Sequence, residues 1–394
     1  MKVLVLAWEF PPRLVGGISR HVAELYPEIV LLGLEVHLVT VEFGEAPALE
    51  VVEGIKVHRV AVAPGKDFFH WINNMNQSME IHGSKLLQEG GFDLIHAHDW
   101  LVGDSAIALK HRFKLPLIAT IHATEYGRNR GIHHHRQQYI HSKEKELVYN
   151  AWRVIVCSQY MYSEVKMALA SPEDKIDIVY NGIRPEKKSQ PADFDFQSFR
   201  RRFADDSEKI IYYVGRMAYE KGVSVLLNAA SKLLREMMGK VKIVIVGGGN
   251  TQHLKQQARY LDIYQNCYFT GFMSDADLDK FQTVADCAVF PSLYEPFGIV
   301  ALESFAARVP VVVSDAGGLA EVVQHGKTGI VTYANNPDSL AWGILEVLRN
   351  PDYAQSLVEN AYESLAERFS WLAIAKQTAT IYERVVQERS QVEW

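Results

Sequence analysis

Two glutamates, Glu295 and Glu303, stand on either side of seven residues in the stretch SLYEPFGIVALE. Pro296 follows the first glutamate, and an apolar run with helical spacing comes next. Because proline is favoured at the first helical position, we expect a helix that starts at Glu295 or Pro296. A helix start binds anions, and a spacing of roughly two turns would put both carboxylates on one face. This arrangement suits a ligand with a central diphosphate and hydroxyl-rich ends, such as a nucleotide sugar; the alternative is a surface helix with solvated glutamates.

Two permanent cations follow the first predicted strand of the second half of the chain. Gly215-Arg216 and Lys221-Gly222 lie there, next to a predicted helix start. A diphosphate leaving group needs such neutralisation as the bond to it breaks. The alternative is an ordinary pair of surface side chains.

Two glycine-rich stretches also follow predicted strands. Val15-Gly16-Gly17 precedes a helix, and glycines there would let a phosphate approach the backbone and leave N–H groups free. The stretch KIVIVGGGN contains Gly247 and Gly249, but it lacks the third glycine of the dinucleotide fingerprint. We therefore interpret the first stretch as a phosphate loop or a plain turn, and the second as a tight turn at the rim of a cleft.

Polar side chains close two neighbouring strands of the first half, with His96, His98 and Asp99 on one and His122 on the next. A metal site there is an alternative to a binding site, but no matched carboxylate spacing accompanies these histidines. The run His133 to His135 resembles a metal cluster, yet three consecutive helical residues cannot all face one ion. We expect no metal site.

Strands alternating with helices predict a parallel sheet in each half of the chain. No repeat of 20–50 residues is present. Pro27 falls inside the first predicted helix and would kink it. The predicted strands of the first half are Lys2 to Ala7, Val36 to Val41, Ile55 to Val62, Asp93 to His96, Leu115 to Ile121, Val154 to Cys157 and Ile176 to Val179, and its predicted helices are Gly16 to Gly33, Phe68 to Leu87, His134 to Tyr149 and Tyr160 to Leu169.

A polar, proline-containing stretch from Arg184 to Lys209 is predicted to connect two domains and to become helical near its end. The tail from Trp371 to Val386 carries one apolar stripe, which could pack on the first domain. The predicted strands of the second half are Ile210 to Val214, Lys242 to Val246, Cys267 to Thr270, Cys287 to Phe290, Val309 to Val313 and Gly329 to Thr332.

Length and composition agree with an ordinary globular protein of two domains. The chain has 394 residues, 48% of them hydrophobic, and a formal net charge of −6. That charge argues against a nucleic-acid protein. The three widely spaced cysteines predict buried free thiols, and the short apolar N-terminus predicts a strand and no signal peptide. No apolar run approaches a membrane span, so we expect a cytoplasmic protein.

Together these residues resemble the retaining glycosyltransferases of family 4 and the related glycogen and starch synthases. SLYEPFGIVALESFAARVPVVVSDAGGLAEVV is similar to the family's pair of glutamates with the following strand and glycine pair. GRMAYEKG is similar to its diphosphate clamp, WEFPPRLVGGISRHV to its N-terminal glycine loop and VYNGI to the end of its first domain, while HAHDW is closest to the glucan synthases. The resemblance covers nearly the whole chain.

This resemblance implies a GT-B fold, an α/β architecture in which two Rossmann-like, doubly wound domains face a cleft. Residues 1–185 would bind the acceptor, residues 186–370 would bind the nucleotide sugar, and a terminal helix in 371–394 would cross back to the first domain. No metal or other cofactor is implied, because cationic side chains and helix termini take the metal's role.

The family's roles carry over to individual positions. Arg216 and Lys221, with Gly215, would stabilise the departing diphosphate, and Glu295 would contact the donor sugar. The backbone at Phe297, Gly298 and Ile299 would help to hold sugar or phosphate, and Glu303 would bind the ribose. Gly16 and Gly17 would approach the diphosphate, and His122 would lie beside the sugar's reacting face. His98, Asp99 and Glu125 are the candidates for acceptor binding.

One position departs from the pattern. Bacterial ADP-glucose-dependent glycogen synthases usually carry a lysine in Lys-x-Gly-Gly, and Leu14 stands there in this chain, with Arg13 beside it as a possible substitute.

We therefore predict a retaining hexosyltransferase that moves glucose from ADP- or UDP-glucose to a glucan or other glycan. One alternative is a transferase for a lipid-linked or exopolysaccharide acceptor, which the basic stretch from Arg128 to Lys145 could bring to a membrane surface. Alternatives of other kinds are a nucleotide-sugar epimerase and a non-catalytic sensor. No motif indicates an oligomeric state.

Overall fold

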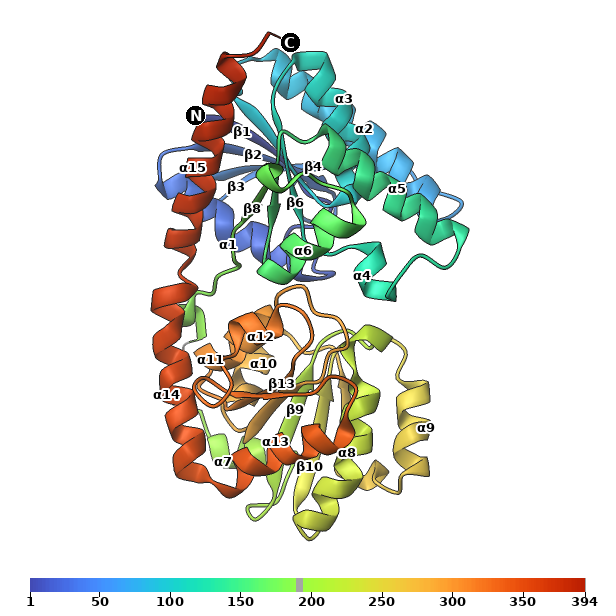
Figure 1. The fold of residues 1–394 in the computed structure, drawn as a ribbon, viewed down its shortest axis with the longest axis vertical. Coiled ribbons are helices and arrows are strands. Elements are labelled where there is room, and N and C mark those ends of the chain that lie inside the picture. The colour runs from blue at the N-terminus through green and yellow to red at the C-terminus, as the bar shows by residue number, and fades with distance from the viewer. Residues whose placement is uncertain (189–193, 394) are drawn as a thin grey trace. The chain divides into compact units, whose positions relative to one another are not determined.

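The computed structural model describes residues 1–188 and 194–393, and it divides into two compact units (Figure 1). The first unit comprises Met1–Gly182 and Trp371–Trp394, and the second comprises Ile183–Ser370. The sequence-based boundary at 185 therefore moves to Gly182, and the tail belongs to the first unit. The stretch predicted as a connection lies in the second unit. It contains the helix α7 (Phe196–Arg200), and its residues 189–193 lie outside the described part of the chain.

The first unit is built on a sheet with the strand order β3-β4-β2-β1-β5-β6-β7-β8. All of its neighbouring strands are parallel except β3, which pairs antiparallel with β4 at the edge. These strands are β1 (Lys2–Leu6), β2 (Glu35–Val41), β3 (Leu49–Val52), β4 (Ile55–Val60), β5 (Leu94–His98), β6 (Leu117–Ile121), β7 (Arg153–Val156) and β8 (Ile176–Ile178).

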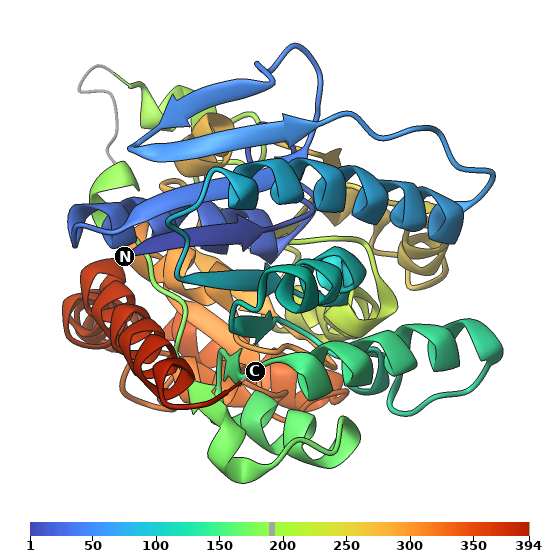
Figure 2. The same cartoon turned by 90° about the horizontal axis from the view of Figure 1, so that it is seen from above.

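Helices cover both faces of this sheet, which is why its strands are apolar on both sides (Figure 2). Val3 and Val5 pack in one core cluster with apolar residues of α1 and α15. On the opposite face, Leu4 lies near Gly83 of α2. The helices of the unit are α1 (Gly17–Leu31), α2 (Phe68–Gln88), α3 (Gly103–Phe113), α4 (Glu125–Asn129), α5 (His135–Asn150), α6 (Gln159–Ala168) and α15 (Trp371–Ser390).

The C-terminal helix α15 packs beside α1, as Figure 1 shows. The apolar stripe predicted from the sequence is buried along its length: Trp371, Ile374, Thr378, Ile381, Tyr382 and Val385. Pro27 does not interrupt α1, which runs as one helix with Pro27 buried inside it.

Sequence reasoning missed three elements of this unit, the edge strand β3 and the helices α3 and α4. It also ended β5 at His96, whereas the strand continues to His98. Histidine and alanine are unusual in a buried strand, which explains why the shorter apolar run was taken as the whole element. The extension matters because it places both histidines on the same face of the sheet.

Packing of α1 against the sheet gives a stability prediction. Ile29 is fully buried on α1, whereas Leu31 of the same helix is 76% exposed. We expect Ile29→Ala to destabilise the first unit by about 2–5 kcal/mol through lost transfer energy and an unfilled cavity. Leu31→Ala should stay within about 0.5 kcal/mol of the wild type. Urea unfolding followed by circular dichroism measures both, and equal midpoints for the two variants would contradict the packing assignment.

The second unit has a fully parallel sheet, as the sequence predicts. Its strand order is β11-β10-β9-β12-β13-β14. Its strands are β9 (Lys209–Val214), β10 (Val241–Val246), β11 (Cys267–Gly271), β12 (Cys287–Phe290), β13 (Val311–Ser314) and β14 (Ile330–Thr332). Its remaining helices are α8 (Val223–Glu236), α9 (Gln252–Tyr260), α10 (Asp275–Gln282), α11 (Ile299–Ala306), α12 (Leu319–Val322), α13 (Pro337–Arg349) and α14 (Pro351–Arg368).

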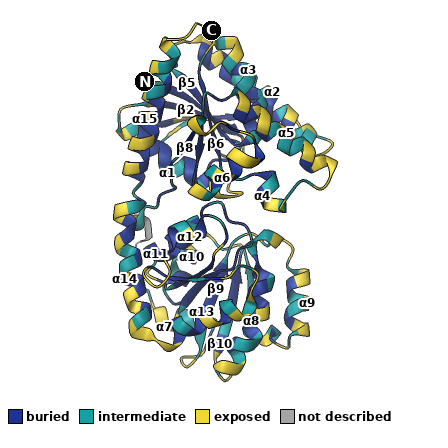
Figure 3. Ribbon diagram, viewed as in Figure 1, coloured by how far each residue is buried: buried dark blue, intermediate teal, exposed yellow. Residues whose placement is uncertain are grey.

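Each unit therefore has its own buried sheet between exposed helical faces (Figure 3). The three cysteines, at 157, 267 and 287, are buried thiols that form no disulfide. Among the helices that the structure describes, none combines the length and the apolar character that crossing a membrane requires.

The strand orders locate the expected ligand sites. In doubly wound sheets, ligands bind at the carboxyl ends of the strands where the strand order reverses. That point lies between β1 and β5 in the first unit and between β9 and β12 in the second. The loops that follow these four strands contain more than half of the residues predicted from the sequence to act at a site, whereas His122 and Glu125 follow β6 and Glu303 lies on α11.

Candidate active site

In the second unit, the loops after β9 and β12 are joined by their backbones. Leu293 and Tyr294 donate their N–H groups to the carbonyl of Glu220, at 2.7 and 3.2 Å. Gly222 has φ 69° and lies so close to the second loop that a Cβ would stand 1.9 Å from the Pro291 carbonyl oxygen. A glycine is therefore required where α8 begins, and the two loops are held together at the switch point of the sheet.

The two loops bring Lys221 and Glu295 into contact. Lys221 Nζ donates to Glu295 Oε2 at 2.7 Å, and Ser292 Oγ donates to the same oxygen at 3.2 Å. Both charged side chains are largely buried, with 19% and 11% exposed. A cation and a carboxylate predicted from separate motifs thus form one pair, and each keeps a small exposed fraction.

Arg216 lies on the loop after β9 that also carries Lys221. Its guanidinium donates to Glu220 at 3.2 Å, and its side chain is 54% exposed. Tyr213 fixes the loop, because its hydroxyl donates to the Arg216 carbonyl at 3.0 Å. Burial raises the pKa of Tyr213, so this hydroxyl keeps its proton. Arg216 is therefore an anchored cation that faces solvent.

The three glycines after β10 support the Arg216 loop. A Cβ on Gly247 would lie 1.9 Å from the Gly215 carbonyl oxygen, and Met217 donates its N–H to the Gly248 carbonyl at 3.1 Å. Gly247 and Gly249 have φ values of 139° and 126°, which side-chain-bearing residues rarely adopt. This stretch is thus a tight turn, as predicted, and it positions the cationic loop.

The predicted helix start at Glu295 or Pro296 is wrong. The helix α11 begins at Ile299, after Gly298 with φ 107°. Glu295 therefore lies in the preceding loop, where its carbonyl accepts from Gly318 N–H at 2.8 Å, and the two glutamates do not share a helix face. Proline at the first helical position is only a preference, and the left-handed glycine decides where this helix starts.

The other residues predicted around α11 differ in exposure. Phe297 is buried with its ring 6.1 Å from that of Phe369, and Ile299 is half-buried. Glu303 is only 3% exposed. Burial raises the pKa of Tyr212, and the nearby charge of Glu303 raises it further. Glu303 thus lies close to the interior of the second unit.

The first unit has its own loop at a switch point, after β1. The carboxylate of Glu9 accepts the N–H groups of Val15 and Gly16, at 2.7 and 2.9 Å. The expectation that this glycine loop leaves its N–H groups free is therefore wrong for these two residues. Glu9 is buried, and burial raises its pKa although these hydrogen bonds lower it. A Cβ on Gly16 would meet only Glu9 Oε1, at an ordinary van der Waals distance of 3.7 Å.

Arg13, at the departure from the glycogen-synthase pattern, is held by aromatic rings. Its guanidinium lies 5.1, 5.9 and 5.3 Å from the ring centroids of Trp8, Phe43 and Trp71. Leu14, which occupies the lysine's place, is 44% exposed. The cation next to the glycine loop is thus stacked among rings, an arrangement that suits a guanidinium better than an ammonium.

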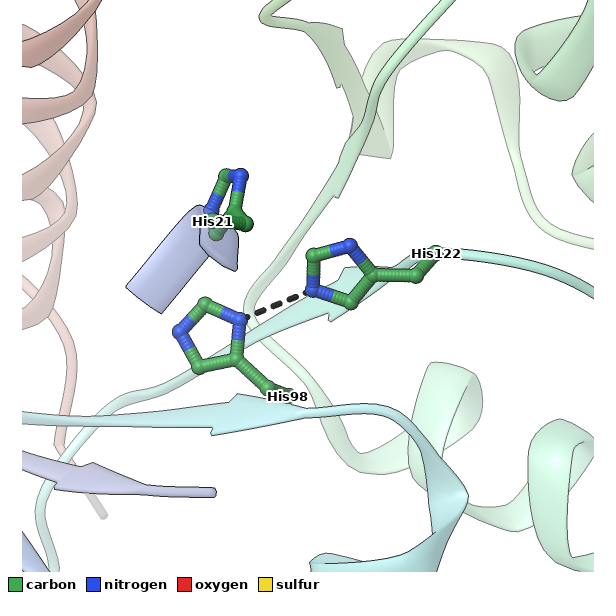
Figure 4. Close-up of side chains that lie close together, drawn as sticks. All are labelled: His21, His98 and His122. Carbon is green, nitrogen blue, oxygen red and sulfur yellow. Dashed lines mark hydrogen bonds between the residues drawn. The ribbon is translucent and has the colours of Figure 1, made fainter. Parts of the chain in front are cut away.

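The two histidines of β5 and the histidine after β6 form a hydrogen-bonded chain with two tyrosines. His96 Nδ1 contacts the Tyr382 hydroxyl at 2.6 Å and the Tyr26 hydroxyl at 2.9 Å. The Tyr26 hydroxyl also contacts His98 Nε2 at 2.7 Å, and His98 Nδ1 contacts His122 Nε2 at 3.0 Å. Figure 4 shows this last bond and a third imidazole, His21, beside it. The chain connects Tyr382, a buried residue in the middle of α15, with the predicted catalytic histidine.

Asp99 lies at the end of this chain in a backbone conformation with φ 62°. Its carboxylate accepts the N–H of His122 at 2.7 Å. Burial raises the pKa of Asp99 to about 7, against the lowering effect of that hydrogen bond. The structure thus brings together His98, Asp99 and His122, as the sequence predicts for neighbouring strand ends.

Glu125 begins the short helix α4, and its N–H donates to Glu144 Oε1 at 2.7 Å. Burial raises the pKa of Glu144 to about 8. His141 Nδ1 lies 3.6 Å from Glu144 Oε2. Burial has the opposite effect on this imidazole and lowers the pKa of His141. Both groups are therefore neutral at pH 7, and this contact is not an ion pair.

The raised pKa of Glu144 predicts a pH-dependent stability difference. The folded state holds a proton on Glu144 between about pH 4.5 and 8, where the unfolded chain has lost it, so rising pH destabilises the wild type across this range. Glu144→Gln can keep the hydrogen bond without titrating. Its stability relative to the wild type should therefore rise from pH 4.5 to 8 and then stay level.

Urea midpoints measured across this pH range test the prediction. Glu146→Gln is the control on the same helix, because Glu146 is 48% exposed and pairs with Lys143. A flat difference for Glu144→Gln would show that this carboxyl is charged in the folded protein.

The basic stretch predicted from Arg128 to Lys145 is partly neutralised. Lys143 pairs with Asp104 and Glu146, at 2.8 and 3.0 Å, and Arg128 lies 3.6 Å from Glu125. A pocket of about 490 Å³ borders this stretch, and none of the predicted acceptor residues lines it. It is lined by Tyr126, Ile132, Gln138, His141, Ser142, Lys145, Met167 and Ala168.

Sequence reasoning missed several residues that the structure places at these sites. Glu9, His21 and Asn181 belong to the motifs WEFPP, GGISRHV and VYNGI, but none was singled out. Tyr382 was seen only as a member of an apolar stripe, and Tyr26 was not singled out. A buried tyrosine needs a partner for its hydroxyl, and that requirement was the available signal.

Comparison with known families agrees with this geometry. Residues 195–364 match the family described as glycosyl transferases group 1, and residues 15–187 match glycosyltransferase family 4. The two matches fall on the second and the first unit, respectively.

Individual relatives cover almost the whole chain. An uncharacterized glycosyltransferase of Methanocaldococcus jannaschii is 37% identical, over 97% of this chain and 98% of its own. A glycogen synthase of Mycobacterium tuberculosis is 34% identical, over 97% of this chain and 94% of its own. The solved structure of a sucrose-phosphate synthase from Thermosynechococcus elongatus has a TM-score of 0.84 at 23% identity, over 98% of this chain and 99% of its own. The fold is thus GT-B.

Proposed function

Because the chain belongs to the group 1 glycosyltransferases, with a first unit of the family 4 type, we propose that it transfers a hexose from a nucleotide diphosphate sugar to a glucan or other glycan, with retention. The observation that carries this proposal is the cluster of Arg216, Lys221 and Glu295 at the switch point of the second unit.

The second unit is proposed to bind the donor. Arg216 and Lys221 would balance the charge that develops on the diphosphate as the sugar leaves, which is where fixed cations lower a barrier most. Glu295 would contact the sugar, and the backbone from Phe297 to Ile299 would hold sugar or phosphate. Glu303 would bind the ribose; since it is buried, it would have to become accessible for this role.

The ion pair between Lys221 and Glu295 has a consequence for catalysis. Each group satisfies the other at 2.7 Å. A bound diphosphate would draw the ammonium away, and Glu295 would then be free to accept a sugar hydroxyl. The pair thus keeps both groups oriented. We propose no metal ion for this step, because two permanent cations and a helix start would supply the positive charge.

Retention is proposed to proceed by displacement on the front face of the sugar. No protein nucleophile is assigned, and the departing phosphate would accept the proton of the attacking hydroxyl. The role of Arg216 and Lys221 is then electrostatic and positional, which is the contribution expected in transfer from a phosphate leaving group.

The first unit is proposed to serve the acceptor through His98, Asp99 and Glu125, and His122 is the proposed catalytic residue of this unit. His122 keeps a fixed orientation because its backbone is bonded to Asp99 and its ring to His98. A Cβ at position 16 would have room within the chain, so packing does not explain the glycine there. The approach of a ligand to the loop of Gly16 and Gly17 would explain it.

The proposed donor is ADP- or UDP-glucose, and the proposed acceptor is an α-glucan. Support comes from the HAHDW stretch and from the 34% identity to a glycogen synthase. Arg13 would take the place of the lysine that glycogen synthases usually carry, since the surrounding rings hold its guanidinium beside the glycine loop.

A donor screen tests the proposal. The purified protein is incubated in EDTA with ADP-, UDP- or GDP-hexoses, with and without maltooligosaccharides, and released nucleotide is measured. We expect release from ADP- or UDP-glucose that depends on the acceptor. Donor consumption without acceptor, with an epimeric sugar as product, would instead show an epimerase. Tight donor binding without turnover would show a sensor.

A further inference from the structure

Three imidazoles gather in the first unit, each from a different element (Figure 4). His21 lies on α1, His98 ends β5, and His122 follows β6. One ring nitrogen of each lies within 4.8 Å of those of the other two. The rings of His21 and His122 meet edge-on with centroids 4.8 Å apart, and those of His98 and His122 are stacked at 5.3 Å.

His21 has a lone pair without a hydrogen-bond partner. Its Nδ1 lies 2.6 Å from the Asn181 amide oxygen, which can only accept, so Nδ1 carries the proton. The lone pair is then on Nε2, and this atom is buried without a partner. The whole residue is only 3% exposed. A buried acceptor without a donor is costly unless something else binds it.

The surroundings of the three rings are dry. His21 and His98 are buried, and His122 is half-buried. A neutral imidazole offers one ring nitrogen with a free lone pair. Neutral imidazoles are preferred ligands for zinc, copper, nickel and iron ions.

Outer-shell contacts of the type found at metal sites are also present. Asn181 orients His21 through its other ring nitrogen, and the Tyr26 hydroxyl lies 2.7 Å from His98 Nε2. Such partners fix the tautomer and the direction of the coordinating nitrogen. The Tyr26 hydroxyl can accept from His98 Nε2 while donating to His96 Nδ1, which leaves the lone pair of His98 on Nδ1.

We propose that His21 Nε2, His98 Nδ1 and His122 Nε2 form a binding site for a divalent transition-metal ion of the zinc class. Three nitrogen ligands leave a fourth position open for water, as in tetrahedral sites with an exchangeable ligand. Binding would replace the hydrogen bond between His98 and His122, and its proton would move to the other nitrogen of His122. The metal would thereby remove the orientation that this bond gives to His122.

The site is therefore inhibitory rather than catalytic, a consequence that rests on the proposed function, in which His122 acts without metal. Zinc should lower turnover, and EDTA should restore it. Metal binding itself is independent of that function and can be measured without any substrate.

Cobalt binding to the full-length, EDTA-treated and dialysed protein tests the site directly. Cobalt in a tetrahedral site absorbs visible light, and titration gives its affinity. We expect one bound cobalt per chain, displaced by zinc. Asn181→Ala and Tyr26→Phe should each weaken binding by about 10–100-fold, as loss of an outer-shell partner does. His21→Ala should weaken it further and should abolish zinc inhibition.

The matched control replaces His133, His134 and His135 together with alanine. These residues form the histidine run outside the proposed site, and this variant should bind cobalt as the wild type does. Unchanged affinity in His21→Ala, loss of binding in the control, or no tetrahedral cobalt spectrum would each overturn the proposal. Circular dichroism verifies that each variant is folded, and an inactive but cobalt-binding protein would count against the proposed function alone.

Discussion

Lys221→Ala is expected to lower kcat by about 100- to 1,000-fold, the loss typical of removing one group that stabilises charge in a transition state. The ammonium is held at 2.7 Å from Glu295 by a loop that is anchored to its neighbour. Its charge would act most strongly on the departing diphosphate, so donor binding should suffer less than turnover. Steady-state kinetics with the donor identified in the screen measures both parameters.

Lys232→Ala is the matched control for this experiment. Lys232 lies on α8 of the same unit and pairs with exposed Asp338 at 3.2 Å, away from the loops after β9 and β12. Its removal should leave kcat unchanged and stability within about 0.5 kcal/mol. If Lys221→Ala retained the kcat of the wild type, the role assigned to Lys221 would be refuted.

Gly222→Ala should destabilise the second unit and reduce activity together. The residue has φ 69°, and a Cβ would stand 1.9 Å from the Pro291 carbonyl oxygen. Backbone atoms cannot swing aside as a flexible side chain can, so the two loops must separate. Lys221 precedes this glycine, and its distance from Glu295 depends on that contact. Activity should therefore fall even under conditions in which the variant is folded.

Gly239→Ala separates the clash from the cost of the backbone conformation. Gly239 has a similar φ of 77°, but no atom lies within 4 Å of the position that a Cβ would take. This variant should lose only about 1–2 kcal/mol of stability, the cost of placing a residue with a side chain in the left-handed conformation, and it should keep its activity. Urea midpoints and kcat for both variants decide the matter, and equal losses would mean that the contact with Pro291 does not hold the loops.

Much of the architecture could be predicted from periodicity. Parallel strands buried on both faces form continuous apolar runs, and each strand of the second unit was found in this way, with its ends shifted by a few residues at most. The edge strand β3 was missed because its residues alternate between half-buried and exposed and include Leu49 and Val51, which contact solvent. Local sequence gives little information about such an edge.

The candidate site was predictable as a set of motifs, but not as a geometry. The pairing of Lys221 with Glu295 depends on the order of strands β9 and β12, which no local pattern contains. The start of α11 was misplaced because the left-handed conformation of Gly298 depends on its packing near Leu319. Partners such as His21 and Asn181 are 160 positions apart in the chain, so only the fold brings them together.

The most direct test of the proposed function is the product formed from maltooligosaccharides. The protein is incubated with ADP- or UDP-glucose and a maltooligosaccharide of single length in EDTA, and products are resolved by mass and by the anomeric signals in proton NMR. We expect a ladder of single hexose additions joined by α-linkages, and no ladder with Lys221→Ala. Products with β-linkages, or an unchanged oligosaccharide despite consumption of the donor, would contradict the retaining glucan transfer proposed for this chain.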